Sequence, residues 1–433
     1  MRYVSTRGGT TPTRLSDALA AGLAPDGGLF VPEQLPTLSL EDFAAAPTLP
    51  AVAAALLRPF FVGDRLAPEL DAICAEAYDV DTPLRRLDAT TNLLELFHGS
   101  TAAFKDYGAR FLAACLRRLR QPDDPPLTIV VATSGDTGAA VGGAFHGIEG
   151  IRIVILYPDG RVSPRQAHQL GAFGDNVRAL RVAGSFDDCQ ALVKRALNDA
   201  DLQRGVPLSS ANSISLGRLL PQMAYYAHAA LFHHREHGEA LNFVVPTGNL
   251  GNAVAAALAR ALGLPIGRIA LATNANRVLP EFFAGGDYTP RASIATIANA
   301  MDVGAPSNFE RLRWLIPEDA TLRREFVASS VDDDHIRDVI RDTWQKYHVA
   351  VCPHTATGLH LRESLRVTSD DTWAIAATAH PAKFESIVEP LIGEAVPLPP
   401  ALAALLALPA HAVRMAADYD AFVAHLTSVS ERD

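Results

Sequence analysis

The stretch LTIVVATSGDTGAA, residues 127–140, decides the fold class. Its first five residues are apolar and rich in β-branched side chains, which predicts a strand buried on both faces. A glycine- and hydroxyl-rich turn follows directly, and the small residues after it continue as a helix. Because a buried strand that runs through a polar turn into a helix is the repeating unit of parallel sheets, we expect an α/β fold.

The same order of apolar strand, turn and helix recurs elsewhere in the chain. Six further short apolar runs are each followed by a turn and a helical pattern: 151–157, 177–182, 242–245, 268–272, 348–351 and 373–377. Strands without polar alternation, separated by helices, indicate a parallel sheet covered on both faces. The part of the chain before residue 93 differs, since it is mostly helical in pattern with extended pieces such as GGLFVPEQLP. Ligands of parallel sheets bind where strands end, so the chemistry is expected in the loops after the strands.

Composition narrows the class of protein. At 433 residues, the chain is long enough for two or three domains. The net charge of −10 argues against nucleic acid as a partner, and no apolar run is long enough to span a membrane. The beginning of the chain has no signal-peptide pattern. The four cysteines are far apart and form no CxxC, which predicts reduced thiols in a cytoplasmic protein and no zinc cluster.

Lysine usage points to a reactive amine. Of 38 basic side chains only four are lysines, and a Schiff base needs a primary amine that can lose its proton, which arginine cannot do. Lys194 and Lys346 lie in amphipathic, charge-flanked helical segments and are expected to be ordinary helix lysines. Lys105 and Lys383 lie in small, polar segments after apolar runs, which makes them the two candidates.

Lys105 belongs to HGSTAAFKD, residues 98–106, and apolar residues recur at helical spacing after it. Ser100 or Thr101 is expected to cap that helix, which places Lys105 in its first turn. The positive end of a helix disfavours an ammonium and so raises the neutral fraction of the amine. A solvated residue at a helix start explains this segment equally well when it is considered alone.

Two loops have the composition of anion sites. PTGNLGN, residues 246–252, follows an apolar strand and opens a helix, an arrangement that lets backbone N–H groups hold a phosphate. No lysine follows it, which excludes a nucleoside-triphosphate P-loop. TSGDTG, residues 133–138, suits a carboxylate at a helix N-terminus, although an ordinary capped turn has the same composition.

Two further segments carry weaker signals. Asn212, Ser213 and Arg218 together offer two neutral donors and a guanidinium for a second phosphate, or else a capped helix with a surface arginine. Thr378 follows the strand at 373–377 and can offer its hydroxyl to a heteroaromatic nitrogen, whereas the alternative is a plain polar turn.

These segments together resemble the threonine synthases, pyridoxal-phosphate enzymes of the tryptophan-synthase-β fold type, over essentially the whole chain. The similar segments are HGSTAAFKD, ATSGDTGAA, GSFDDCQALVK, NSISLGRLL, VPTGNLGN and ATAHPAKF. Serine/threonine dehydratases and cysteine synthase share the lysine and glycine loops but not DDCQ or AHPAKF. Two positions depart from expectation: Ser100 stands where proline is expected, and Asp136 replaces the asparagine of the wider fold type.

The resemblance implies a fold and a set of roles. The fold is two open, mostly parallel twisted sheets flanked by helices, with domains at 1–92 (mainly helical extension), 93–205 (small) and 206–433 (large). Lys105 forms the Schiff base with the cofactor. The other cofactor contacts are Asp136 at the phenolic oxygen, Thr378 at the ring nitrogen, and Gly248, Asn249, Leu250, Gly251 and Asn252 at the phosphate. The substrate contacts are Thr133, Ser134, Gly135 and Thr137 for the carboxylate and Asn212, Ser213 and Arg218 for the substrate phosphate.

The implied reaction converts O-phospho-L-homoserine and water to L-threonine and phosphate, by elimination at the γ-carbon and addition of water at the β-carbon. The expected assembly is a monomer or a homodimer, with no metal. Two alternatives remain open: a dehydratase-like enzyme of the same fold, and a catalytically silent binding protein. The second anion site, at Asn212, Ser213 and Arg218, separates the first alternative from a threonine synthase, because an unphosphorylated substrate does not need it.

Overall fold

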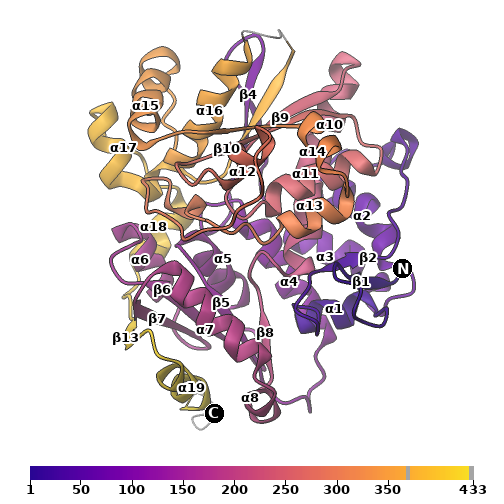
Figure 1. The fold of residues 1–433 in the computed structure, drawn as a ribbon, viewed down its shortest axis with the longest axis vertical. Helices are drawn as coiled ribbons and strands as arrows, with labels where there is room; N and C mark the ends of the chain where they lie inside the picture. The colour runs from indigo at the N-terminus through magenta and orange to yellow at the C-terminus, as the bar shows by residue number, and fades with distance from the viewer. Residues whose placement is uncertain (367–370, 429–433) are drawn as a thin grey trace.

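The computed structural model describes residues 1–366 and 371–428, and its architecture is the expected α/β arrangement with two main sheets (Figure 1). The six-stranded sheet has the order β11–β10–β9–β12–β4–β3 and is parallel except for β3. Its strands are β3 (Leu84–Arg86), β4 (Thr91–Glu95), β9 (Leu241–Pro246), β10 (Ile266–Thr273), β11 (Phe326–Ser330) and β12 (Trp373–Ala377). The five-stranded sheet is parallel throughout, with the order β13–β7–β6–β5–β8. Its strands are β5 (Leu127–Ala132), β6 (Ile151–Pro158), β7 (Val177–Ala183), β8 (Leu208–Ser210) and β13 (Val413–Ala416).

Helices flank both sheets, since the central strands β5, β6, β9 and β12 are largely apolar, are buried along almost their whole length and must be covered on both faces. In Figure 1 the larger sheet and its helices occupy the upper part and the smaller sheet the lower part. The helices that follow the strands are α4 (Lys105–Leu119), α5 (Asp136–Phe145), α6 (Pro164–Gly171), α7 (Phe186–Asn198), α8 (Ala200–Gly205), α9 (Leu216–Leu219), α10 (Met223–His237), α11 (Gly251–Ala261), α12 (Val278–Phe283), α13 (Phe309–Leu315), α14 (Asp319–Glu325), α15 (Asp333–Tyr347), α16 (Pro353–Arg366), α17 (Glu385–Ile392), α18 (Pro400–Leu406) and α19 (Tyr419–Ser428).

The N-terminal region is mainly helical, as expected, with one small hairpin-like pairing of β1 (Tyr3–Ser5) and β2 (Phe30–Pro32). Its helices are α1 (Leu15–Ala21), α2 (Leu49–Leu57) and α3 (Leu70–Ala77), with short 3-10 turns η1 (Leu40–Phe43), η2 (Arg58–Phe61) and η3 (Ala67–Glu69) between them. Further 3-10 turns are η4 (Leu220–Gln222), η5 (Asn299–Met301) and η6 (Pro381–Phe384).

One predicted strand is wrong and others were missed. Residues 348–351 form no strand, because His348 has a left-handed backbone (φ 52°) that ends α15, and α16 begins at Pro353.

Strand pairing also crosses the expected domain ranges. β4 starts before residue 93 and belongs to the larger sheet, whereas β13, far along the chain, belongs to the smaller one. The division at residues 92 and 205 stays a prediction.

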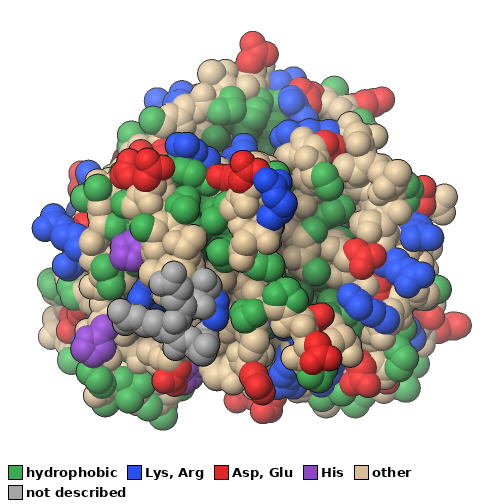
Figure 2. Space-filling model, turned by 90° about the horizontal axis from the view of Figure 1, so that it is seen from below, with side chains coloured by type: hydrophobic (Ala, Val, Ile, Leu, Met, Phe, Trp, Pro, Cys, Tyr) green, Lys and Arg blue, Asp and Glu red, His purple; other side chains and the backbone are tan. Residues whose placement is uncertain are grey.

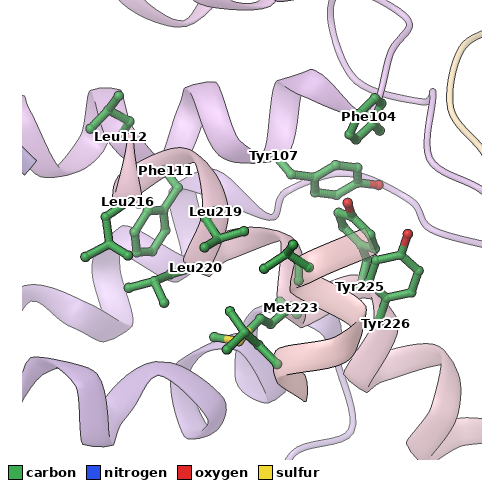
Figure 3. Close-up of a cluster of buried hydrophobic side chains, with 14 of the residues drawn as sticks. Phe104, Tyr107, Phe111, Leu112, Leu216, Leu219, Leu220, Met223, Tyr225 and Tyr226 are labelled. Carbon is green, nitrogen blue, oxygen red and sulfur yellow. The ribbon is translucent and has the colours of Figure 1, made fainter. Parts of the chain in front are cut away.

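A large apolar cluster fixes the helix that carries Lys105. Figure 3 shows side chains of α4 meeting those of α9, η4 and α10. The rings of Tyr107 and Tyr225 lie 5.3 Å apart, and those of Tyr225 and Tyr226 lie 4.7 Å apart. Because these rings are fully buried, the first turn of α4 is held rigidly.

The surface of the protein carries charged side chains of both signs. In Figure 2, which views the molecule from below, acidic and basic side chains are interspersed rather than gathered by sign. Within residues 1–366 and 371–428, no helix combines the length and apolar character needed to cross a membrane.

Candidate active site

All five polar segments singled out in the sequence follow strands at their carboxyl ends. Three of these strands, β9, β12 and β4, are neighbours in the larger sheet, and β5 and β8 are neighbours in the smaller sheet. The loops after β4 and β12 are joined directly, since Phe104 N donates to Thr378 O at 2.9 Å and Ala103 pairs with Ala379. Parallel pairing therefore brings together loops that are far apart in the chain.

These loops surround a cavity of about 350 Å³, within the usual range for a small-molecule site. Both sheets and the N-terminal region contribute to its wall. The predicted site residues that line it are Lys105, Thr133, Ser134, Asp136, Thr137, Asn212, Ser213 and Asn249. The other predicted site residues are not part of its lining: Gly135, Arg218, Gly248, Leu250, Gly251, Asn252 and Thr378.

Lys105 is the first residue of α4 and reaches the cavity, with Nζ 4.3 Å from the centre of the Phe104 ring. Loss of solvation and the nearby Arg218 guanidinium lower the pKa of Lys105 to about 7, against an opposing effect of Asp136. The expected cap by Ser100 or Thr101 is wrong, because the helix begins after Phe104 without a side-chain cap. Instead Asp106 reaches back and accepts from Thr101 N at 2.9 Å.

Lys383, the other candidate amine, is placed differently. Its side chain is 0% exposed, and Nζ contacts Asp136 Oδ1 at 2.7 Å and donates to Thr101 O at 2.9 Å. An ammonium held by a carboxylate and a carbonyl is not available as a nucleophile. The structure therefore separates the two lysines that the sequence left as rivals.

The TSGDTG loop presents two unused hydroxyls at the start of α5. Thr133 Oγ1 accepts from Gly135 N at 2.9 Å and Gly138 N at 3.0 Å, so its side chain holds the loop. Gly135 has φ 131°, a conformation that requires glycine. Ser134 and Thr137 line the cavity, and their hydroxyls form no hydrogen bond with another residue that the structure describes. They and the helix N-terminus suit an anion.

The glycine loop leads from β9 into α11. Leu250 has a left-handed backbone (φ 62°), and a Cβ at Gly248 would lie 2.8 Å from Met301 Cα, so the loop packs closely against η5. The side chain of Asn252 is used within the loop, where it accepts from Thr247 Oγ1 at 2.8 Å and donates to Pro246 O at 2.9 Å. Asn249 Nδ2 donates to Ser213 Oγ at 2.5 Å, which links this loop to the other predicted anion site.

Arg218 is a buried guanidinium, 2% exposed, rather than a surface residue. It donates to Ala211 O at 2.5 Å and to Lys105 O at 3.4 Å, whereas Nε has no partner. Burial lowers its pKa to about 10 against the opposing charge of the nearby Asp106, and no carboxylate among the described residues forms an ion pair with it. A buried cation without an ion-pair partner is costly, and a bound anion at this place would relieve that cost. Asn212 instead ties β8 to β5 through both backbone groups of Ala132.

The residues present fit pyridoxal phosphate. An amine of low pKa faces a cavity that also receives Asp136, and a glycine loop begins α11 nearby. Thr378, whose hydroxyl forms no hydrogen bond with another described residue, lies in the loop that pairs with the Lys105 loop. An amine, a carboxylate, a hydroxyl and a glycine loop are groups that suit the aldehyde, phenol, ring nitrogen and phosphate of the cofactor, respectively.

Sequence reasoning missed several residues of the cavity wall. Lys194 and Gln190 reach it from one face of α7, and Arg7 reaches it from the N-terminal region, where its Nε pairs with Glu310 at 3.1 Å. The spacing of Phe186, Gln190 and Lys194 on one helix face was visible in the sequence. No signal there showed which partner that face meets.

Comparisons with known proteins agree over the whole chain. Residues 78–378 match the family described as "Pyridoxal-phosphate dependent enzyme", residues 2–78 match "Threonine synthase N terminus", and residues 355–425 match "Threonine synthase, C-terminal". The threonine synthase of Escherichia coli is 38% identical over 409 residues, which cover 94% of each chain. That of Haemophilus influenzae is 38% identical over 388 residues, covering 89% of this chain and 90% of the relative.

Solved structures give the same result. The crystal structure of threonine synthase from Escherichia coli matches with a TM-score of 0.92 and 35% identity, covering 99% of this chain and 100% of the other. The structure of threonine synthase from Brucella melitensis with bound pyridoxal phosphate matches with a TM-score of 0.91 and 35% identity, covering 100% of both chains. The chain therefore belongs to the threonine synthase family of enzymes that use pyridoxal phosphate as their cofactor.

Proposed function

We propose that this enzyme converts O-phospho-L-homoserine and water to L-threonine and phosphate in the cavity that Lys105 lines. The single observation that carries the choice of substrate is Arg218, a buried guanidinium next to Lys105 without a carboxylate partner among the described residues. Its position supports a site for a phosphate other than that of the cofactor, which the glycine loop would hold.

Each anion of the substrate has a matching group. Ser134, Thr137 and the N-terminus of α5 would hold the carboxylate. Ser213, whose oxygen accepts a hydrogen bond from Asn249 of the glycine loop, would direct its hydroxyl to the substrate phosphate together with Arg218. Two anion sites in one cavity fix the distance between the ends of the substrate and so place its reacting carbons.

Bound pyridoxal phosphate supplies the electron withdrawal that acidifies the protons next to the substrate amine. Lys105, with a pKa of about 7, would take the proton from the α-carbon and return it after water has added. Asp136, whose charge acts on the pKa of this amine, would lie near the phenolic oxygen of the cofactor, and Thr378 would offer its hydroxyl to the ring nitrogen without adding a charge. The assembly is proposed to be a monomer or a homodimer.

Substitution of Arg218 tests the choice of substrate. Arg218→Lys replaces a two-pronged donor by a point charge, and the loss of one charge-assisted bond of ~1.5–3 kcal/mol predicts a roughly ten- to hundred-fold lower kcat/KM for phosphate release. The visible band of the cofactor is expected to remain. Release of phosphate that does not depend on Arg218, or a preference of the wild type for serine or threonine as substrate, would favour a dehydratase-like enzyme instead.

A further inference from the structure

A buried ion pair connects the two sheets under the candidate active site. Lys383, in η6 after β12, meets Asp136, at the start of α5, with 2.7 Å between Nζ and Oδ1. Gln166 Nε2 donates to the same oxygen at 3.0 Å. Oδ2 of Asp136 accepts no hydrogen bond from another described residue, and Asp136 lines the cavity that contains Lys105. One oxygen of this cavity-lining carboxylate is thus held by two donors, and the other is left without a donor among the described residues.

The pair is not explained by stability. Removing two charges from water costs about as much as their attraction returns, so apolar residues of similar volume would serve a purely structural role as well or better. The backbone of η6 is also held independently, since Ser163 Oγ donates to Lys383 O at 2.8 Å and Arg165 donates to Ala382 O at 2.5 Å. A charge at this place therefore needs a reason in the chemistry of the cavity.

Three other titratable groups around the pair, His354, His380 and Cys352, are neutral at pH 7. Burial lowers the pKa of His354 and that of His380 to about 4, and burial raises the pKa of Cys352. Burial also raises the pKa of Asp106, against its hydrogen bonds with Thr101. For Asp136 itself, burial opposes the charged form, but Lys383, His354 and hydrogen bonds from Lys383 and Gln166 bring the pKa below its usual value. The groups that face the pair across the cavity are Lys105 and, behind it, Arg218.

We propose that Lys383 is a positioning residue, whose ammonium fixes the orientation of the Asp136 carboxylate at the cavity, and that the charge of this carboxylate sets the proton affinity of the Schiff base on Lys105. The inference rests on the proposed function, because the carboxylate acts in this way only if Lys105 carries the cofactor. A negative charge near a protonated nitrogen favours the protonated form, and a positive charge disfavours it. As the pair is neutral overall, the removal of either member leaves the opposite charge beside the nitrogen.

The test is the pH midpoint at which the visible band of the bound cofactor is lost as the nitrogen deprotonates. Lys383→Met leaves the carboxylate alone and is expected to raise this midpoint, whereas Asp136→Asn leaves the ammonium alone and is expected to lower it, each by on the order of one pH unit. The double variant is expected to fall between them, and Lys383→Arg, which keeps the charge, is expected to stay near the wild type. Lys346→Met, a substitution on the exposed face of α15, is the matched control and should leave the midpoint unchanged.

Shifts of the same sign in the two single variants, or no shift in either, would overturn the inference while leaving the proposed function intact. If Lys383→Met does not fold, Asp136→Asn and Lys383→Arg decide instead: a lower midpoint in the first and an unchanged one in the second support the inference, and any other pair of results contradicts it. Borohydride trapping of the cofactor on the wild-type protein distinguishes failure of this inference from failure of the proposed function. A cofactor trapped on Lys383 would refute the proposed function itself.

Discussion

At the scale of residues, the candidate site depends on one amine, that of Lys105. Lys105 and Lys383 are both lysines in small, polar segments, and sequence composition does not rank them. The structure does so through their partners: Lys383 Nζ is fully enclosed by a carboxylate and a carbonyl, whereas Lys105 lines the cavity beside a buried guanidinium. Because those partners come from distant parts of the chain, no local pattern could have identified them.

The pKa of Lys105 leads to a prediction about labelling. In the cofactor-free chain, acylation of Lys105 by acetic anhydride is expected to be half-maximal near pH 7, because only the neutral amine reacts. The exposed Lys346, whose pKa is raised by its hydrogen bond with Tyr347, should require a far higher pH and is the internal control. Mass spectrometry of each peptide against pH gives both profiles. Identical profiles for the two lysines would contradict the lowered pKa.

The same shift has a consequence for stability, with a definite sign. The folded chain releases the Lys105 proton near pH 7, whereas the unfolded chain keeps it up to about pH 10.5. The unfolded state therefore binds more protons in this window, and the contribution of Lys105 to the free energy of unfolding rises as the pH increases from 7 to 10.5.

Secondary-structure elements were predictable where periodicity is strong. Six of the seven apolar runs are strands, within one or two residues at each end, because buried parallel strands have no polar alternation. The run at 348–351 failed because its four residues serve as the link between α15 and α16, where burial also favours apolar side chains. In the two main sheets, the strands β3, β4, β8, β11 and β13 were missed because they are short and lie in sequence of mixed polarity.

The close packing of the glycine loop gives a prediction at this scale. Gly248→Ala would place Cβ 2.8 Å from the backbone of Met301, so we expect the free energy of unfolding to fall by about 1–3 kcal/mol and the affinity for the cofactor to fall with it. Gly251→Ala, whose Cβ would meet nothing within 3.5 Å and which keeps its N–H group, is the matched control. Denaturant unfolding and cofactor titration measure the two effects. Equal behaviour of the two variants would mean that the loop does not depend on its approach to η5.

The face of α7 that lines the cavity gives a second prediction at the scale of secondary-structure elements. Lys194 is exposed at the cavity wall, and we expect Lys194→Ala to raise KM for the phosphorylated substrate by roughly three- to ten-fold at low salt, since it removes a charge that attracts the substrate. Its neighbour Arg195 lies over the Tyr419 ring, 3.7 Å from the centroid, so Arg195→Ala removes an equal charge away from the cavity. If both variants change KM alike, net charge rather than position is responsible.

At the scale of the whole molecule, the cavity is built by segments from most of the chain. Loops after β4, β5, β8 and β9 line it together with Arg7 of the N-terminal region, which pairs with Glu310 of α13. The strand β13 returns the end of the chain to the smaller sheet (Figure 1). The sequence could indicate that the loops follow strands, but not the strand order that makes them neighbours. That order depends on pairing between segments that are distant in the chain, which the sequence patterns did not predict.

The most direct test of the central claim is the identity of the lysine that carries the cofactor. The purified protein is to be loaded with pyridoxal phosphate, reduced with borohydride, digested and analysed by mass spectrometry, with Lys105→Ala treated in parallel. The account predicts one label, on Lys105, and no label in the variant. A label on Lys383, or a wild-type protein that takes up no cofactor, would contradict it.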